Sequence, residues 1–278
     1  LTDFESFAAA VGAYLRDSIA TSYRDSMRLL QAQMDYAQTP LTSCFFDGCV
    51  ERGRDMILGT KYNILSCGGA FFANAVDSMA AIREVVYEKK LATLEEVAAA
   101  CRANFKGHER LRARLLAAPK HGNDDPRLDE IIRLVERLRD IPMKEICRDP
   151  RDGTPFGNVH IVRHTAVTTG RATPATPDGR MAGTPLAASV ASSVGCERSG
   201  PTAVLNSVAK MNAVKSWQTG YQANLRFQSA MLSNPANRAK VRAMLNVYFG
   251  KGGQQLQINA VDSEMLRAAQ QNPGEYRD

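Results

Sequence analysis

The sequence lacks any long hydrophobic run and any recognisable targeting segment. No apolar stretch approaches the roughly 18 residues that span a bilayer, so we expect no membrane insertion. The first residues, Leu1-Thr-Asp-Phe-Glu-Ser, contain no basic region followed by an apolar block, which argues against a secretory signal. The chain also begins without Met, which suggests a fragment.

Motifs for metals, nucleotides and nucleic acids are also missing. The six cysteines form no Cys-x-x-Cys pair and no cluster with histidine, which argues against a zinc site and favours reduced thiols in the cytoplasm. His160 and His164 lie in an extended segment, too far apart to share a metal ion. The sequence has neither a P-loop nor a G-x-G-x-x-G after a strand. Its net charge of +6 is spread among mixed charges, so we expect no nucleic-acid binding.

What is present indicates one globular domain of mixed secondary structure. The 278 residues are 44% apolar and 23% charged, which is ordinary for a globular protein. We find no internal repeat and no low-complexity linker, so we expect a single domain over residues 1–278. Residues 149–200 are rich in Pro, Gly, Thr and Ser and are predicted to form a long ordered loop region.

Helical and extended patterns alternate along the chain. Apolar spacing and capping patterns, with capping boxes at Thr2–Glu5 and Thr93–Glu96, predict helices over about 3–36, 71–90, 93–104, from 125 past 138, 203–214, 234–248 and 262–271. Alternating patterns predict strands at 158–162, 221–228 and 255–259, and residues 41–50 are predicted to be a short strand or loop. The last two strands have amide-rich faces, which we expect to line a polar cavity.

A thiol and a carboxylate stand two residues apart in Cys44-Phe-Phe-Asp-Gly-Cys49-Val-Glu51-Arg-Gly-Arg-Asp55. In an extended segment or tight loop the side chains of Cys49 and Glu51 would point into one cavity. A neighbouring carboxylate opposes thiolate formation, so the pair is a poor polar nucleophile. It suits chemistry in which sulfur transfers a hydrogen atom and the carboxylate a proton. The alternative is an ordinary buried cysteine.

Several motifs together resemble the glycyl radical enzymes, the superfamily of pyruvate formate-lyase and glycerol dehydratase. The resemblance covers almost the whole chain, in family order: Asp47 to Met56, Gly59 to Asn63, Asn74 to Ile82, Ala118 to Asp124, Thr176 to Arg180, Gly183 to Leu186 and Gly252 to Asn259. We interpret Asp178 and Arg180 as a turn with a local ion pair, and substrate contact by either remains open.

The resemblance implies a fold and a chemistry. The expected fold is α/β, part of a ten-stranded barrel made of two half-barrels ringed by helices. Cys49 would become a thiyl radical that takes a hydrogen atom from substrate carbon, and Glu51 would be the base in a radical lyase or dehydratase of anaerobic metabolism. No cofactor is expected in this segment, because the glycyl radical is installed by a separate activating enzyme that uses S-adenosylmethionine and an iron–sulfur cluster. The full-length protein is expected to be a cytoplasmic homodimer acting on a small polar molecule.

Two departures from the family pattern bear on this interpretation. Pyruvate formate-lyase carries adjacent cysteines, whereas Gly48 precedes Cys49, which favours the dehydratase branch. The radical-glycine motif would follow Asp278 and the N-terminal half-barrel would precede Leu1, so we expect a middle-to-late segment that is inactive alone. Formate acetyltransferase activity and a non-catalytic remnant are the alternatives.

Overall fold

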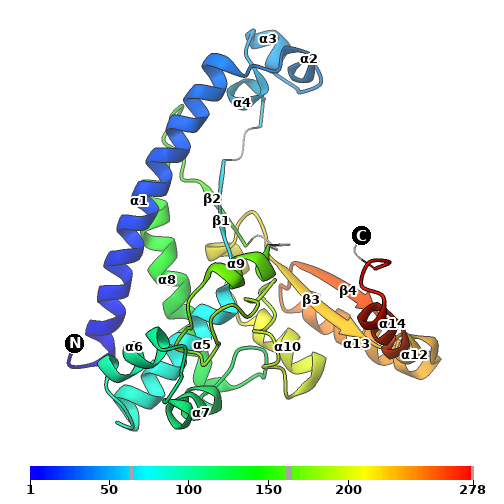
Figure 1. The fold of residues 1–278 in the computed structure, drawn as a ribbon. Helices are drawn as coiled ribbons and strands as arrows, with labels where there is room; N and C mark the ends of the chain where they lie inside the picture. Colours follow the sequence, from blue (N-terminus) through cyan, green and yellow to red (C-terminus); the bar gives the residue numbers. More distant parts are fainter. Residues whose placement is uncertain (63–64, 161–164, 277–278) are drawn as a thin grey trace. The chain divides into compact units, whose positions relative to one another are not determined.

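The computed structural model describes residues 1–62, 65–160 and 165–276, which form two compact units of α/β structure (Figure 1). Unit 1 contains Leu1–Cys67 and Glu136–Val159, and unit 2 contains Gly68–Val135 and His160–Asp278. The boundaries between the two units lie within one helix and within two strands. The amino-acid composition shows no linker at these positions. His164 and Asn63, named among the sequence features above, lie outside the described residues.

Unit 1 is built on the long helix α1 (Phe4–Tyr36), close to the bounds predicted for it. The helix begins at Asp3, whose side chain accepts the Ser6 backbone N–H at 2.7 Å, so the expected cap built on Thr2 and Glu5 is wrong by one residue. The other elements are α2 (Pro40–Ser43), α3 (Cys49–Arg52), α4 (Met56–Gly59), the C-terminal part of α8 (Asp129–Ile146) and most of the paired strands β1 (Ser66–Gly69) and β2 (Gly157–His160).

The core of unit 1 lies where α1 meets the end of α8. Met143, Cys147 and Phe156 are buried there, and side chains from α1 and β1 pack against them. Tyr23 of α1 stacks edge to face on Phe156 and donates its hydroxyl to the Arg148 carbonyl at 2.7 Å. Beyond α1, residues 41–50 contain most of the short helix α2, turns over 44–48 and the start of α3, so the structure has no strand there and a loop flanked by helical turns; α4 follows.

Unit 2 is organised around α5 (Phe72–Ile82), which continues directly into a π-helix, η1 (Arg83–Glu88). Nine of the eleven α5 residues are buried, so this helix is the centre of the unit. The other helices are α6 (Leu94–Arg102), α7 (Glu109–Ala117), η2 (Pro126–Leu128), α9 (Ala166–Ala172), α10 (Gly200–Ala209), α11 (Ala213–Ser216), α12 (Ser229–Ser233), α13 (Pro235–Gly250) and α14 (Ser263–Gln271). The capping box predicted at Thr93 is confirmed, with the Thr93 hydroxyl oxygen accepting the Glu96 N–H at 3.2 Å.

Strands β3 (Gln222–Phe227) and β4 (Gln255–Ala260) pair in parallel, with Leu225 opposite Ile258. Parallel neighbours need a crossover, and α12 and α13 supply it (Figure 1). The four strands of the described residues lie in two two-stranded sheets, and no barrel is closed within them. The predicted ten-stranded barrel therefore stays a prediction.

Candidate active site

Two glycines with positive φ set the bounds of the helical turn that carries Cys49. Gly48 (φ +91°) precedes α3 and Gly53 (φ +58°) follows it. A Cβ on Gly48 would lie 2.9 Å from the Lys61 backbone nitrogen and 3.2 Å from the Gly59 carbonyl oxygen, whereas a Cβ on Gly53 would meet nothing within 4 Å. Residue 48 must therefore be glycine both for its backbone conformation and for space.

Asp55 ties the segments on both sides of this turn together. Its carboxylate accepts the Thr39 N–H at 2.6 Å and the Ile57 N–H at 3.1 Å, and the Ser43 hydroxyl lies 3.1 Å away. The hydrogen bond from the Thr39 backbone is the largest cause that lowers the pKa of Asp55. The Ser43 oxygen in turn accepts the Met56 N–H at 2.8 Å. The Cys49 turn is thus held by polar contacts at its base.

Cys49 is 2% exposed and lines a pocket of about 290 Å³. Burial raises the pKa of the Cys49 thiol, and the nearby Asp55 carboxylate raises it further, with a smaller contribution from Glu51. The other lining residues are Gln38, Pro40, Ser43, Cys44, Val50, Gly53, Arg54 and Asp55. The thiol therefore stays protonated at neutral pH.

The side chains of Glu51 and Cys49 point in different directions. The two residues belong to one helical turn, in which positions two apart differ by about 200° around the axis. Glu51 is exposed and is not among the residues that line the Cys49 pocket. The expectation that both side chains point into one cavity is wrong for this conformation, because it assumed an extended segment.

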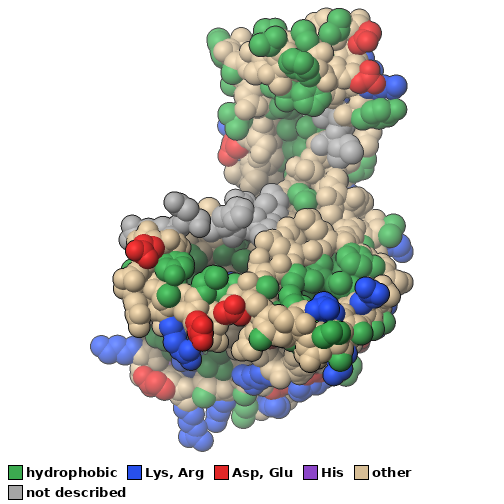
Figure 2. Space-filling model, turned by 90° about the vertical axis from the view of Figure 1, so that its right-hand side faces the viewer, with side chains coloured by type: hydrophobic (Ala, Val, Ile, Leu, Met, Phe, Trp, Pro, Cys, Tyr) green, Lys and Arg blue, Asp and Glu red, His purple; other side chains and the backbone are tan. Residues whose placement is uncertain are grey.

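Apolar side chains surround the Cys49 turn on its outer surface. Leu41, Phe45 and Val50 are exposed by 76%, 81% and 66%. Figure 2 shows hydrophobic side chains gathered on the surface of this end of unit 1. Several large apolar side chains exposed close to one another are typical of a segment that another surface covers.

In unit 2, residues from three of the family motifs meet Ala187 and Ser193 in one buried polar cluster. Asp77 accepts the His121 N–H and the Ser193 hydroxyl, each at 2.6 Å. One turn earlier on α5, the Asn74 amide donates to Asp178 at 2.8 Å and accepts the Ala187 N–H at 2.8 Å. Asp77 and His121 lie in motifs given in the sequence analysis, which assigned them no role, and Ser193 lies in none of those motifs. The available signal was two polar residues, Asn74 and Asp77, three apart on a largely apolar helix.

Burial perturbs both titratable groups at the centre of this cluster. It raises the pKa of Asp77 to about 7, although Ser193 and the His121 backbone N–H oppose the shift. It lowers the pKa of His121 to about 4. His121 Nε2 lies 2.9 Å from the Val190 carbonyl oxygen, which can only accept, so the neutral ring carries its proton on Nε2. Perturbed groups of this kind are candidates for function, but buried structural networks produce them too.

Arg180 binds backbone carbonyls. Its guanidinium donates to the carbonyl oxygens of Met181 (3.1 Å), Thr184 (2.7 Å) and Pro174, while its backbone N–H donates to Asp178 at 3.2 Å. The predicted turn is confirmed, because the Gly179 N–H donates to the Thr176 carbonyl at 3.0 Å and the Thr176 N–H donates to the Arg180 carbonyl at 3.0 Å. This arrangement accounts for the motif structurally, and substrate contact remains unassigned.

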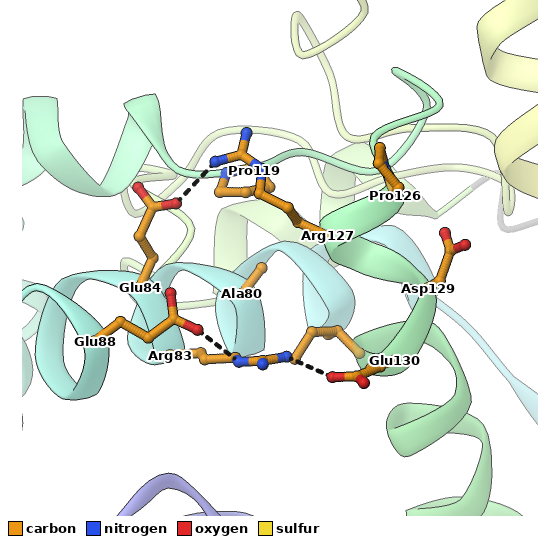
Figure 3. A pocket seen from close by; sticks show the side chains of 10 residues that line it. Ala80, Arg83, Glu84, Glu88, Pro119, Pro126, Arg127, Asp129 and Glu130 are labelled. Carbon is orange, nitrogen blue, oxygen red and sulfur yellow. Dashed lines mark hydrogen bonds and ion pairs between the residues drawn. The ribbon is translucent and has the colours of Figure 1, made fainter.

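A second pocket, of about 370 Å³, lies beside η1 in unit 2 (Figure 3). Its charges pair with one another: Arg83 contacts Glu88 at 2.9 Å and Glu130 at 3.2 Å, and Arg127 contacts Glu84 at 3.3 Å. This pocket holds neither cysteine nor histidine. Among the described residues, no group of three or more His, Cys, Asp or Glu is placed to hold a metal ion.

The polar face of the β3–β4 sheet carries amides that bond to one another. Gln222 donates to Asn224 at 3.0 Å and to Gln257 at 2.5 Å, and Gln257 donates to Asn259 at 3.3 Å. The opposite face of β3 is buried. That this polar face lines a cavity stays a prediction. Within the described part of the chain, no helix is long and apolar enough to cross a membrane.

Comparisons with known proteins agree with the motifs. The pyruvate formate lyase-like family model matches residues 1–154, and the glycine radical model matches residues 186–278. The chain is 33% identical to the probable dehydratase YbiW of Escherichia coli (95% of this chain, 33% of that protein) and 30% identical to the trans-4-hydroxy-L-proline dehydratase of Clostridioides difficile (86% and 30%).

Among solved structures, the glycerol-bound form of the B12-independent glycerol dehydratase from Clostridium butyricum matches with a TM-score of 0.92 and 30% identity. That match covers 99% of this chain and 35% of the dehydratase chain. The chain thus spans about a third of the length of these relatives.

Proposed function

This chain belongs to the glycyl radical enzymes of the pyruvate formate lyase-like family, and we propose that it carries the hydrogen-abstracting cysteine of a radical lyase or dehydratase. The names of its relatives include dehydratases of trans-4-hydroxy-L-proline and of glycerol, both small hydroxylated molecules. A small polar substrate with a hydroxyl or similar leaving group is therefore proposed for the whole protein. We also propose the activating enzyme that uses S-adenosylmethionine and an iron–sulfur cluster as a partner, and a homodimer.

The observation that carries the proposal is the buried Cys49 thiol with its raised pKa. Hydrogen-atom transfer uses an intact S–H bond, and a thiolate has no hydrogen atom to exchange. A nucleophilic cysteine needs the opposite environment, with a lowered pKa. Burial and Asp55 therefore favour radical chemistry at Cys49 over polar attack.

In the proposed reaction, the sulfur of Cys49 acts as a thiyl radical and removes a hydrogen atom from a substrate carbon, which re-forms the S–H bond. Glu51 removes the proton of the hydroxyl on that carbon. The neighbouring C–O bond then breaks, and the leaving hydroxide takes the proton held by Glu51 and departs as water. The product radical takes the hydrogen atom back from the Cys49 S–H bond, which regenerates the thiyl radical. In the described conformation Glu51 points away from the Cys49 pocket, so its proposed role as base requires a different conformation of this turn.

Formate acetyltransferase activity is the less favoured candidate. By the family pattern it needs a second cysteine at position 48, next to Cys49. A side chain there would need a positive φ and would come within 3 Å of the Lys61 backbone nitrogen. The geometry of Gly48 therefore supports the dehydratase branch.

The test uses an intact, activated protein that includes this sequence and a panel of small polyols and hydroxylated amino acids. Cys49→Ala should abolish turnover, whereas Cys44→Ala, which alters the same pocket, should retain it. Glu51→Gln should stop elimination and leave the radical visible by electron paramagnetic resonance. Turnover by Cys49→Ala would refute the proposal, and normal elimination by Glu51→Gln would refute only the assigned base.

A further inference from the structure

Asp55, at the start of α4, uses its two carboxylate oxygens for different contacts. Oδ1 accepts the Ile57 N–H at 3.1 Å, which is the usual cap of a helix N-terminus. Oδ2 lies 2.6 Å from the Thr39 nitrogen, 3.2 Å from the Thr39 hydroxyl and 3.1 Å from the Ser43 hydroxyl. A cap needs only one oxygen. The second oxygen joins α4 to a segment that lies 12 to 16 residues earlier in the chain.

The two segments that Oδ2 joins form the walls of the Cys49 pocket. Residues of both segments line it: Gln38, Pro40, Ser43 and Cys44 before the turn, and Gly53, Arg54 and Asp55 after it. Ser43, which is 5% exposed, adds a second connection between them, because its oxygen accepts the Met56 N–H at 2.8 Å and lies 2.8 Å from the Thr39 carbonyl oxygen. The contacts of Asp55 and Ser43 therefore fix the space around the thiol.

The charge of Asp55 acts on the same thiol. The hydrogen bond from the Thr39 backbone is the main cause that lowers the pKa of Asp55, so this carboxylate is ionised at neutral pH. After burial, the Asp55 charge is the largest cause that raises the pKa of Cys49. The other groups that act on the thiol are Glu51 and Cys44, which raise its pKa, and Arg52, which lowers it. Asp55 is thus a fixed anion beside the sulfur.

We propose that Asp55 is a positioning residue for hydrogen abstraction by Cys49, because its second oxygen holds together the two segments that enclose the thiol. This inference rests on the proposed function, since it assigns Asp55 a part in that reaction. Both oxygens of Asp55 are occupied within the chain, so Asp55 acts through Cys49 and not on the substrate. Its negative charge also disfavours the thiolate, which has no hydrogen atom to transfer.

Two substitutions in the intact, activated protein separate position from charge. Asp55→Asn removes the charge and one acceptor, whereas Ser43→Ala removes a contact to Oδ2 and leaves the charge. Both should lower kcat about tenfold or more with little change in KM, because the thiol is no longer held in place. The pH midpoint of Cys49 alkylation by iodoacetamide, read on its peptide, should fall by about half to one unit in Asp55→Asn only. Asp25→Asn, an exposed carboxylate of α1, should change neither.

An unchanged kcat in both Asp55→Asn and Ser43→Ala would overturn the proposal, and so would an effect confined to KM, which would place Asp55 on the substrate. If Asp55→Asn does not fold, Asp55→Ser retains an oxygen that can cap α4 and should give the same loss of kcat and the same shift of the alkylation midpoint. Turnover by Cys49→Ala would be a failure of the proposed function itself, and the alkylation midpoint still measures what Asp55 does to the thiol.

Discussion

Replacing Asp77 with Asn should make the protein more stable, and the gain should grow with pH. Asp77 is fully buried with its pKa raised to about 7, so the folded state holds a proton there that the unfolded chain releases near pH 4. Between these values the folded state binds more protons, and stability falls as pH rises. Asn cannot ionise, and its amide can donate to the Ser193 oxygen while its carbonyl accepts the His121 N–H.

The magnitude follows from the two pKa values. A shift from 3.8 to about 7 removes roughly 4 kcal/mol of stability once both states are ionised above pH 7. At pH 5 only about 1.5 kcal/mol of that loss has occurred, because the folded carboxyl is still protonated. The difference between the Asn variant and the parent should therefore grow by about 3 kcal/mol from pH 5 to pH 8.

Urea unfolding at a series of pH values measures this difference. The single tryptophan, Trp217, is 1% exposed in unit 2 and stacks edge to face on Phe72, so its fluorescence reports on the unit that contains Asp77. Ser189→Ala, a buried substitution that removes no titratable group, should shift stability equally at every pH. If the difference in free energy of unfolding between Asp77→Asn and the parent does not change with pH, or shrinks toward pH 8, the assigned pKa and its cause are refuted.

Three further predictions concern other buried or constrained groups. As pH falls from 6.5 to 4, the free energy of unfolding should fall by about 3 kcal/mol, because the unfolded chain gains a proton on His121 that the buried ring excludes. His121→Gln should abolish this fall. Urea unfolding at several pH values tests this, and an unchanged dependence of the free energy of unfolding on pH contradicts it. Gly48→Ala should speed amide exchange at Lys61 more than tenfold, because the added Cβ collides with the Lys61 backbone. Gly53→Ala meets no neighbouring atom and should cost only about 1–2 kcal/mol of left-handed strain. An equal rise in Lys61 amide exchange in both variants contradicts the steric argument. Arg180→Lys should lower thermal stability by about 1–3 kcal/mol, since Lys cannot match the guanidinium fork; an unchanged melting temperature shows that those bonds contribute little.

Local signals were enough to predict the longest helices and three of the four described strands, but not α7, nor α9 inside the stretch 149–200 predicted as a loop. Thr93 and Glu96 lie within one turn of each other, so their reciprocal cap could be predicted from four letters. Strand β3 alternates buried and more exposed residues, as its sequence predicts. At the start of α1 two adjacent polar residues could each cap the helix, and pattern alone did not distinguish Thr2 from Asp3.

The buried cluster of unit 2 could not be assembled in the same way. Asp77 and Ser193 are 116 residues apart, and Asn74 and Asp178 are 104 apart. Their contacts depend on how α5 packs against loops that have no periodicity of their own. Sequence motifs contained Asn74, Asp77 and Asp178 but not Ser193, and only the fold shows that these residues bond to one another.

The Cys49 segment shows how contacts outside a short stretch decide the direction of its side chains. Gly48 and Gly53 allow both an extended and a helical path, so the sequence between them does not choose. Asp55 fixes Thr39 from one side, and the Lys61 N–H bonds to the Asp47 carbonyl at 2.6 Å from the other. These contacts leave room for a single helical turn, which directs Cys49 into its pocket and Glu51 away from it. The C–H hydrogen and the hydroxyl proton on one substrate carbon are neighbours, so Cys49 and Glu51 can act on them together only if this turn adopts another conformation.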